Sequence, residues 1–213
     1  ARSTLLVRME TDDGLVGWGE TAPLGGVRHA IEQDFAPLLL GRDPTWVQRS
    51  WRTPWLAPFE SGLAIAALDI AIHDLWGQAL GVPIHQLYGG ARRTRVPAYA
   101  SGMIYLEGIH PRDRWIPEAR GLVEQGFRAI KVRTGRYDPD VELPLLAKLR
   151  EALPADVRLA VDAWGSYTLP TALRVGRELG AMGFTFYEEP LPQYGYRNYP
   201  ELTAALDIAV SGG

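Results

Sequence analysis

The stretch that decides the fold is Ala129–Gly165, AIKVRTGRYDPDVELPLLAKLREALPADVRLAVDAWG. Residues 129–135 predict a strand, because the segment is short, carries β-branched residues and ends at Gly135. A helical segment, 140–154, comes next, and a second strand-like segment, 158–165, follows it. A strand, a helix and another strand in this order predict two parallel strands joined by a crossover helix.

The same alternation extends along the second part of the chain. The expected strands are 96–102, 129–135, 158–165, 184–190 and 207–213, and the expected helices between them are 118–126, 140–154, 169–183 and 199–206. This βαβαβαβαβ order predicts a parallel sheet with helices outside it, either as an open doubly wound sheet or as a barrel.

The first part of the chain has a different pattern. Two strand-like runs flank Asp13-Gly14, a strong hairpin signal. An amphipathic segment (27–44), a connector rich in Trp and Pro (51–62) and a long apolar helix (63–81) follow. A hairpin followed by helices predicts an α+β unit, so we expect two domains, 1–92 and 93–213.

Composition limits the function classes. The chain is 46% hydrophobic and 22% charged with a net charge of −3, as in an ordinary globular protein. Its cations are spread along the sequence, which argues against nucleic-acid or membrane-surface partners. The absence of cysteine excludes disulfides and thiolate metal sites. We see no apolar run of membrane-spanning length and no signal peptide, so a cytoplasmic protein is expected.

Charged residues stand where three successive strands end. Lys131 and Arg133 share one face of their strand, Asp162 ends the next strand, and Glu188 and Glu189 end the one after. Functional groups of parallel α/β proteins lie at these carboxyl ends. A single such charge would be read as an exposed tip or a structural ion pair, but three strands in a row favour a metal and anion site. Oxygen ligands without His or Cys favour Mg²⁺. Strand periodicity does not decide which of the two glutamates faces inward.

Several motifs, taken in order, resemble the enolase superfamily in its mandelate racemase/muconate lactonizing enzyme branch. The segment DDGLVGWGE (12–20) is similar to that family's capping hairpin, and ALDIAIHDLWGQALGVPIHQLYGG (67–90) is similar to the helix and turn before its barrel. AIKVRTG, VDAWG and YEEP stand at the places of its K-x-K, D-x-N and E-x-P motifs.

This resemblance implies an α/β fold with an N-terminal α+β capping domain, followed by the first part of a modified (β/α)-barrel of the TIM-barrel type. It implies one Mg²⁺ held by Asp162 and Glu188, with Lys131 and Arg133 as catalytic residues. It also implies a small-molecule carboxylate substrate that loses the proton beside its carboxylate, and a homo-oligomer. A metal ion and cationic groups can stabilise the enediolate that such a reaction forms.

Three features depart from the family pattern. Arg133 replaces the second lysine of K-x-K; arginine stays protonated, so it suits an electrophile, a carboxylate anchor or a tuner of Lys131. Lys131 can serve as a base if flanking cations lower its pKa; otherwise the base lies on a later strand. Trp164 replaces the Asn of D-x-N. The family's third metal ligand normally follows the Gly-Gly at which this chain ends, so we expect a chain truncated after the fifth barrel strand.

Some candidates concern substrate contact or have simpler roles. Trp164 and the cap-loop glycines Gly25 and Gly26 are expected to contact substrate. The connector 51–59 resembles loops that close over it, with packing of its aromatic residues against the barrel as the alternative. Other residues have structural interpretations: a core or interface role for His73, surface or cap positions for His29, His85 and His110, a turn and helix N-cap at Asp138 and Asp140, and core packing for Trp18.

The function expected first is that of an acid-sugar dehydratase. A racemase, epimerase or cycloisomerase of the same superfamily is the alternative. A non-catalytic or inactive truncated relative, serving in binding or assembly, is the alternative of another class. The residue after Gly213 distinguishes them, because an acid there would support the enzyme.

Overall fold

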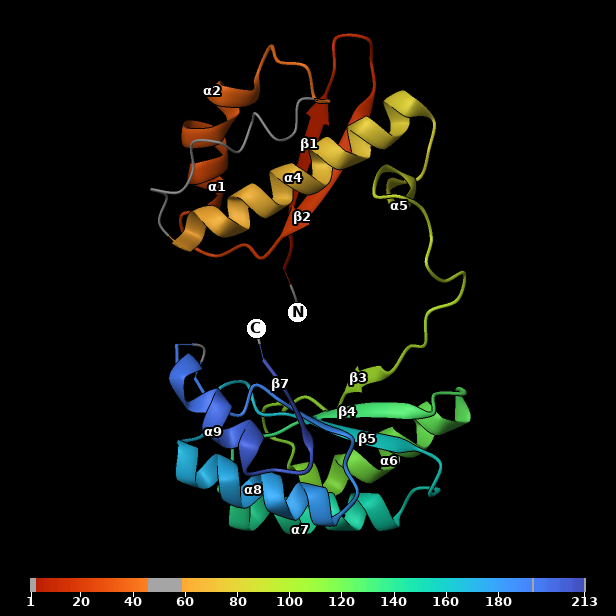
Figure 1. The fold of residues 1–213 in the computed structure, drawn as a ribbon, viewed down its shortest axis with the longest axis vertical. Helices are drawn as coiled ribbons and strands as arrows, with labels where there is room; N and C mark the ends of the chain where they lie inside the picture. Colours follow the sequence, from red (N-terminus) through yellow and green to blue (C-terminus); the bar gives the residue numbers. More distant parts are fainter. Residues whose placement is uncertain (1–2, 46–58, 193, 213) are drawn as a thin grey trace. The chain divides into compact units, whose positions relative to one another are not determined.

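The structure is a computed structural model that describes residues 3–45, 59–192 and 194–212. The chain divides into two compact units, Ala1–Arg95 and Val96–Gly213 (Figure 1). The sequence placed the boundary between residues 92 and 93.

The first unit is an antiparallel hairpin covered by a long helix. Strand β1 (Leu5–Glu10) pairs with β2 (Val16–Thr21), and α4 (Phe59–Leu80) lies across them (Figure 1). A Cβ atom at Gly19 would stand 1.9 Å from the Ala67 carbonyl oxygen. The helix can approach the strand this closely only because the position carries no side chain.

Short helical segments complete this unit. They are α1 (Val27–His29), the π-helical segment η1 (Ala30–Phe35), α2 (Ala36–Leu39) and α5 (Ile84–Leu87). The predicted amphipathic helix therefore exists, with a π-helical centre, and it buries Val27, Ala30 and Phe35.

Two sequence-based expectations change in this unit. Trp18 is exposed rather than in the core, because the neighbouring glycines of β2 take the face against α4 and alternation turns Trp18 to the other face. The segment Gly62–Leu80 of α4 is long and apolar enough to cross a membrane by length and composition. The expectation that no run reaches this length therefore does not hold, although buried Ala64, Ala67 and Leu68 are packed as in a core helix.

The second unit is a parallel sheet. Its strands are β3 (Ala100–Gly102), β4 (Ala129–Arg133), β5 (Arg158–Asp162), β6 (Phe186–Glu188) and β7 (Ala209–Ser211), in the order β3-β4-β5-β6-β7. Every neighbouring pair is parallel. The strand order follows the chain without reversal, as in a (β/α)-barrel, whereas a doubly wound sheet reverses at a switch point. The structure thus decides for a partial barrel.

Helices connect the strands. They are α6 (Pro111–Glu124), α7 (Pro139–Glu151), α8 (Leu169–Ala181), the 3₁₀ turn η3 (Tyr196–Asn198) and α9 (Tyr199–Ala204). Helix α6 begins earlier than the sequence predicted, because His110 accepts a hydrogen bond from the Arg112 amide and caps it. Strand β3 is shorter than predicted. Of the two residues predicted at this turn and N-cap, Asp138 caps α7 by accepting a hydrogen bond from the Asp140 amide.

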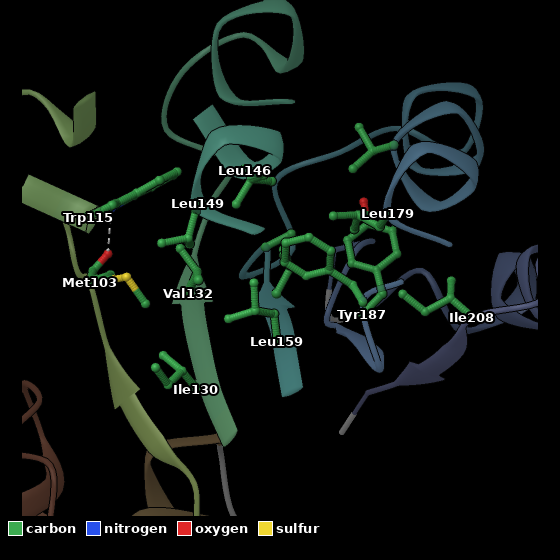
Figure 2. Packing of buried hydrophobic residues seen from close by; sticks show 14 of the residues in the cluster. Met103, Trp115, Ile130, Val132, Leu146, Leu149, Leu159, Leu179, Tyr187 and Ile208 are labelled. Carbon is green, nitrogen blue, oxygen red and sulfur yellow. Dashed lines mark hydrogen bonds between the residues drawn. The ribbon is translucent and has the colours of Figure 1, made fainter. Parts of the chain in front are cut away.

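The core lies between the sheet and the helices α6, α7 and α8. Figure 2 shows Ile130, Val132, Leu159 and Tyr187 of the strands packed with helix residues such as Leu149. Since residues alternate along a strand, the residues between these core positions face the opposite side of the sheet. This alternation presents Lys131 and Arg133 on the face that bears the candidate site.

Candidate active site

The register of the sheet brings the charged strand ends into one row. Arg133 pairs with Asp162, Asp162 with Glu188, and Glu188 with Ser211. Lys131 precedes this row on the same face of β4. The parallel register therefore converts distant residues of the sequence into neighbours at the carboxyl ends of three strands.

Four charged side chains contact one another in this row. The Lys131 Nζ atom lies 2.7 Å from Glu188 Oε2 and 3.4 Å from Asp162 Oδ2. Arg133 Nη1 lies 3.2 Å from Asp162 Oδ1. Lys131 and Asp162 are buried. Burying such charges is costly unless they are paired, and here two cations offset two carboxylates.

The structure distinguishes the two adjacent glutamates. Tyr187 is fully buried in the core, so Glu188 on the opposite face meets Lys131. Glu189 follows β6 with φ 42°, and its amide donates to the Ser211 carbonyl, 2.8 Å away. Glu188 is thus the glutamate that shares the charged row.

The surroundings of Lys131 favour its ammonium form. Burial lowers the pKa of Lys131, but the hydrogen bond that Lys131 donates to Glu188 and the charges of Glu188 and Asp162 outweigh burial, so the pKa is raised. The Tyr99 ring, whose centroid lies 5.4 Å from Nζ, also faces this ammonium group. The neighbouring carboxylates therefore raise the pKa of Lys131. The sequence had suggested the opposite effect, a pKa lowered by flanking cations.

Trp164 is held in an unusual conformation beside Arg133. Its φ of 48° lies in the left-handed region, where a side chain other than Asn, Asp or Gly is uncommon. The Trp164 amide donates to Asp162 Oδ1 at 3.0 Å, and the guanidinium carbon of Arg133 lies 5.4 Å from the indole centroid. Trp164 nevertheless remains 75% exposed. A large exposed ring fixed against a site cation is available to contact a ligand.

A hollow of about 420 Å³ lies beside this ring. It is lined by Trp164, Gly165, Glu189, Leu191, Tyr196, Tyr199 and Gly212. Its volume is within the range of small-molecule sites. Tyr99, Tyr196 and Tyr199 were not predicted from the sequence, where the available signal was only an aromatic residue near a strand end.

The remaining predicted residues lie elsewhere. Gly25 and Gly26 belong to the first unit, where Gly26 has φ 87° just before α1, so their contact with substrate stays a prediction. His73 is buried; its Nδ1 bonds to the Asp69 carbonyl at 2.8 Å and its Nε2 to the Tyr88 hydroxyl, which supports a structural role. The connector 51–58 lies outside the described residues.

The donor set fits a hard divalent cation. Asp162 and Glu188 both direct a carboxylate oxygen at the Lys131 ammonium group, so a positive charge is favoured between them. Carboxylate oxygens are the ligands that Mg²⁺ prefers, and Mg²⁺ usually retains several waters. Within 3–45, 59–192 and 194–212, no group of three or more His, Cys, Asp or Glu side chains is placed to hold a metal. These two carboxylates would therefore supply only part of a coordination sphere.

Comparisons with known proteins agree with this geometry. Residues 1–89 match the mandelate racemase/muconate lactonizing enzyme N-terminal domain, and residues 115–213 match the enolase C-terminal domain-like family. The chain is 32% identical to a D-galactarolactone cycloisomerase from Agrobacterium fabrum and 33% identical to an arabinonate dehydratase from Saccharolobus solfataricus. The alignments cover 100% and 96% of this chain and 57% of each relative.

A solved structure gives the same result. A mandelate racemase/muconate lactonizing protein from Paracoccus denitrificans, complexed with magnesium, superposes with a TM-score of 0.87 at 34% identity, covering 98% of this chain and 60% of that one. The chain thus spans less than two thirds of the length of these relatives. It belongs to the mandelate racemase/muconate lactonizing enzyme branch of the enolase superfamily, with a capping unit and a partial α/β barrel.

Proposed function

We propose that the protein is a Mg²⁺-dependent enzyme that removes the proton on the carbon beside a substrate carboxylate, and that its reaction is the dehydration of an acid sugar. The observation that carries the proposal is the row of Lys131, Arg133, Asp162 and Glu188 at the carboxyl ends of β4, β5 and β6. Two cations beside two hard-oxygen ligands suit a substrate whose carboxylate gains negative charge during the reaction.

The division of labour follows from side-chain chemistry. Asp162 and Glu188 would hold Mg²⁺, which when bound supplies positive charge against the charge developing on the substrate carboxylate. Arg133 stays protonated, so it binds or stabilises that carboxylate and does not accept the proton. Lys131 is held as the ammonium ion, so we assign to it the donation of a proton to the hydroxyl that leaves as water. In a dehydration, a base outside this row takes the proton of the broken C–H bond, and the electrons of that bond move towards the carboxylate.

Two features favour an acid sugar. One relative is named an arabinonate dehydratase. The hollow beside the site combines the exposed rings of Trp164 and Tyr196 with the carboxylate of Glu189. Aromatic faces can pack against the C–H face of a polyhydroxy acid, while a carboxylate accepts hydrogen bonds from its hydroxyls.

Cycloisomerisation is the second candidate, because another relative is named a D-galactarolactone cycloisomerase. It uses the same first step, the loss of a proton beside the carboxylate. The two candidates then differ in the group that leaves. A homo-oligomer in the cytoplasm, acting on a small carboxylate without nucleic-acid or membrane partners, completes the proposal.

The test uses the complete natural protein with Mg²⁺ and a panel of acid sugars in D₂O, followed by NMR. We expect deuterium at the carbon beside the carboxylate and a 2-keto-3-deoxy product. Exchange without loss of water would assign racemisation or cycloisomerisation instead. No exchange with any acid would contradict the enzymatic proposal and favour a non-catalytic relative.

Asp162→Asn tests the site itself. Removing one of two carboxylate ligands should weaken Mg²⁺ binding at least about tenfold and abolish most turnover. Asp138→Asn is the matched control, because Asp138 is an exposed helix cap and Asn caps helices equally well. If Asp162→Asn leaves both Mg²⁺ affinity and turnover at the level of the control, the assignment is wrong.

A further inference from the structure

A buried glutamate lies behind the charged row, on the helix side of the sheet. Glu142 of α7 is only 1% exposed. Among the described residues, no cationic side chain forms an ion pair with it, unlike Asp162 and Glu188. A buried carboxylate without a counter-ion is costly unless hydrogen bonds satisfy it, so its partners indicate why it is there.

Four donors surround the Glu142 carboxylate. Oε2 accepts from the Gly135 amide at 2.8 Å and the Tyr167 hydroxyl at 3.3 Å. Oε1 accepts from the Tyr137 amide at 3.1 Å and the Tyr105 hydroxyl. Because each partner donates, the arrangement suits the ionised carboxylate, which only accepts. Hydrogen bonds to a charged acceptor are stronger than those between neutral groups.

The tyrosine partners remain donors at neutral pH. Burial raises the pKa of Tyr105, and its hydrogen bond to Glu142 raises it further. Burial likewise raises the pKa of Tyr167, and the charge of Glu142 adds to this effect. Both hydroxyls therefore keep their protons over the range in which an enzyme of this kind would be assayed.

The four donors come from three different strand-end loops. Tyr105 lies in the loop after β3, Gly135 and Tyr137 in the loop after β4, and Tyr167 in the loop after β5. Gly135 follows Arg133 closely, and a Cβ atom there would stand 2.5 Å from Ser166 Oγ in the loop after Asp162. The loops after β4 and β5 are thus packed tightly against each other, and the Glu142 carboxylate binds all three loops.

We propose that Glu142 is a positioning residue, whose carboxylate fixes the strand ends that carry Lys131, Arg133 and Asp162. This inference rests on the proposed function for its link to catalysis. The loop lock, by which we mean the hydrogen bonds of Glu142 to the three loops, can be tested without any substrate. A misplacement of reacting groups by about 1 Å can reduce a rate about a hundredfold. Glu142→Gln replaces one acceptor with an NH₂ donor that faces other donors, at almost unchanged size.

Arg150→Met is the matched control. Arg150 lies on the same helix as Glu142, but it binds the backbone carbonyls of Leu153, Pro154 and Val157 before β5, at the opposite end of the strands. Its loss should destabilise the fold without disturbing the carboxyl-terminal strand ends. Tyr167→Phe is a milder second variant, since it removes one donor hydroxyl and keeps the ring.

The experiment combines amide hydrogen exchange with steady-state kinetics of the complete protein and Mg²⁺. In Glu142→Gln we expect at least tenfold faster exchange of the Gly135 and Tyr137 amides, and a fall in kcat of ten- to a hundredfold with less than threefold change in KM. Tyr167→Phe should show a smaller kcat loss of the same kind. Arg150→Met should lower the thermal midpoint and leave both readouts unchanged.

Two results would overturn the inference. Unchanged amide protection in Glu142→Gln would show that no lock exists, whatever the reaction is. If Glu142→Gln and Arg150→Met changed kcat and KM to the same extent, Glu142 would contribute only to the stability of the fold. If the natural protein shows no proton exchange with any acid, the proposed function fails, while the amide protection still decides the lock.

Discussion

Replacing Lys131 with Met would separate its structural role from its chemical one. The chain contains only two lysines, Lys131 and Lys148. The Lys131 ammonium group contacts both Asp162 and Glu188, and methionine keeps an unbranched chain without the charge. The substitution therefore leaves two carboxylates with Arg133 as their only cation in the row, and the local charge changes from neutral to negative.

The magnitude follows from burial. Removing one partner of a buried ion pair costs about 3–5 kcal/mol of unfolding free energy. The Glu188 side chain is 25% exposed, so water compensates part of the loss and we expect the lower end, about 3 kcal/mol. For a protein of this size that corresponds to a fall in Tm of roughly 6–12 °C.

Mg²⁺ should reverse this loss in a way that identifies the site. A divalent cation bound by Asp162 and Glu188 replaces the missing positive charge, and anything that binds the native state stabilises it. Adding Mg²⁺ should therefore raise the Tm of Lys131→Met by more than that of the natural protein, although the variant lacks turnover. Scanning calorimetry in EDTA and in Mg²⁺ measures both increments.

Lys148→Met is the internal control. Lys148 is an exposed residue of α7, so its replacement should change the unfolding free energy by less than about 0.5 kcal/mol and leave the Mg²⁺ increment unchanged. A Lys131→Met variant as stable as the natural protein in EDTA would show that the ion pairs of Lys131 do not stabilise the fold. Equal stabilisation of both proteins by Mg²⁺ would show that Lys131 does not share the position of the metal.

Two further predictions concern packing and pH. Gly19→Ala should cost about 3 kcal/mol or more, because its Cβ would overlap the Ala67 carbonyl, whereas Gly25→Ala, with open space around it, should change stability by less than about 0.5 kcal/mol in urea unfolding. A large cost at Gly25 would contradict this account. Tyr187 has a buried hydroxyl without a hydrogen-bond partner in the described part of the chain, and burial raises the pKa of Tyr187. Its folded-state pKa exceeds the unfolded value of about 10, so its contribution is present below that pH and is lost as the pH rises. Tyr187→Phe should therefore be folded at pH 7 and lose less unfolding free energy than the natural protein between about pH 9 and 11. An identical loss in both proteins would show that ionisation of Tyr187 does not contribute.

Local pattern was enough to predict most elements. The structure contains the predicted strands around Lys131, Asp162 and Glu188 and the predicted helices between them. β-branched runs, glycines and amphipathic periodicity were the patterns that predicted these elements. Their boundaries moved where a side chain acted over a short distance, as His110 did in capping α6. The prediction that Trp18 packs in the core was wrong, because its exposure depends on which face of β2 contacts α4. That contact joins segments far apart in the chain, so a local pattern does not reveal it.

The sequence by itself determined that cations and carboxylates end successive strands, because alternation and the strand-helix repeat are encoded within a few residues. Only the tertiary structure decided that the sheet follows chain order, that Glu188 rather than Glu189 meets Lys131, and that Glu142 joins three loops. Those contacts link residues far apart in the chain. Burial and strand register fix them, and neither is visible in a local stretch of sequence.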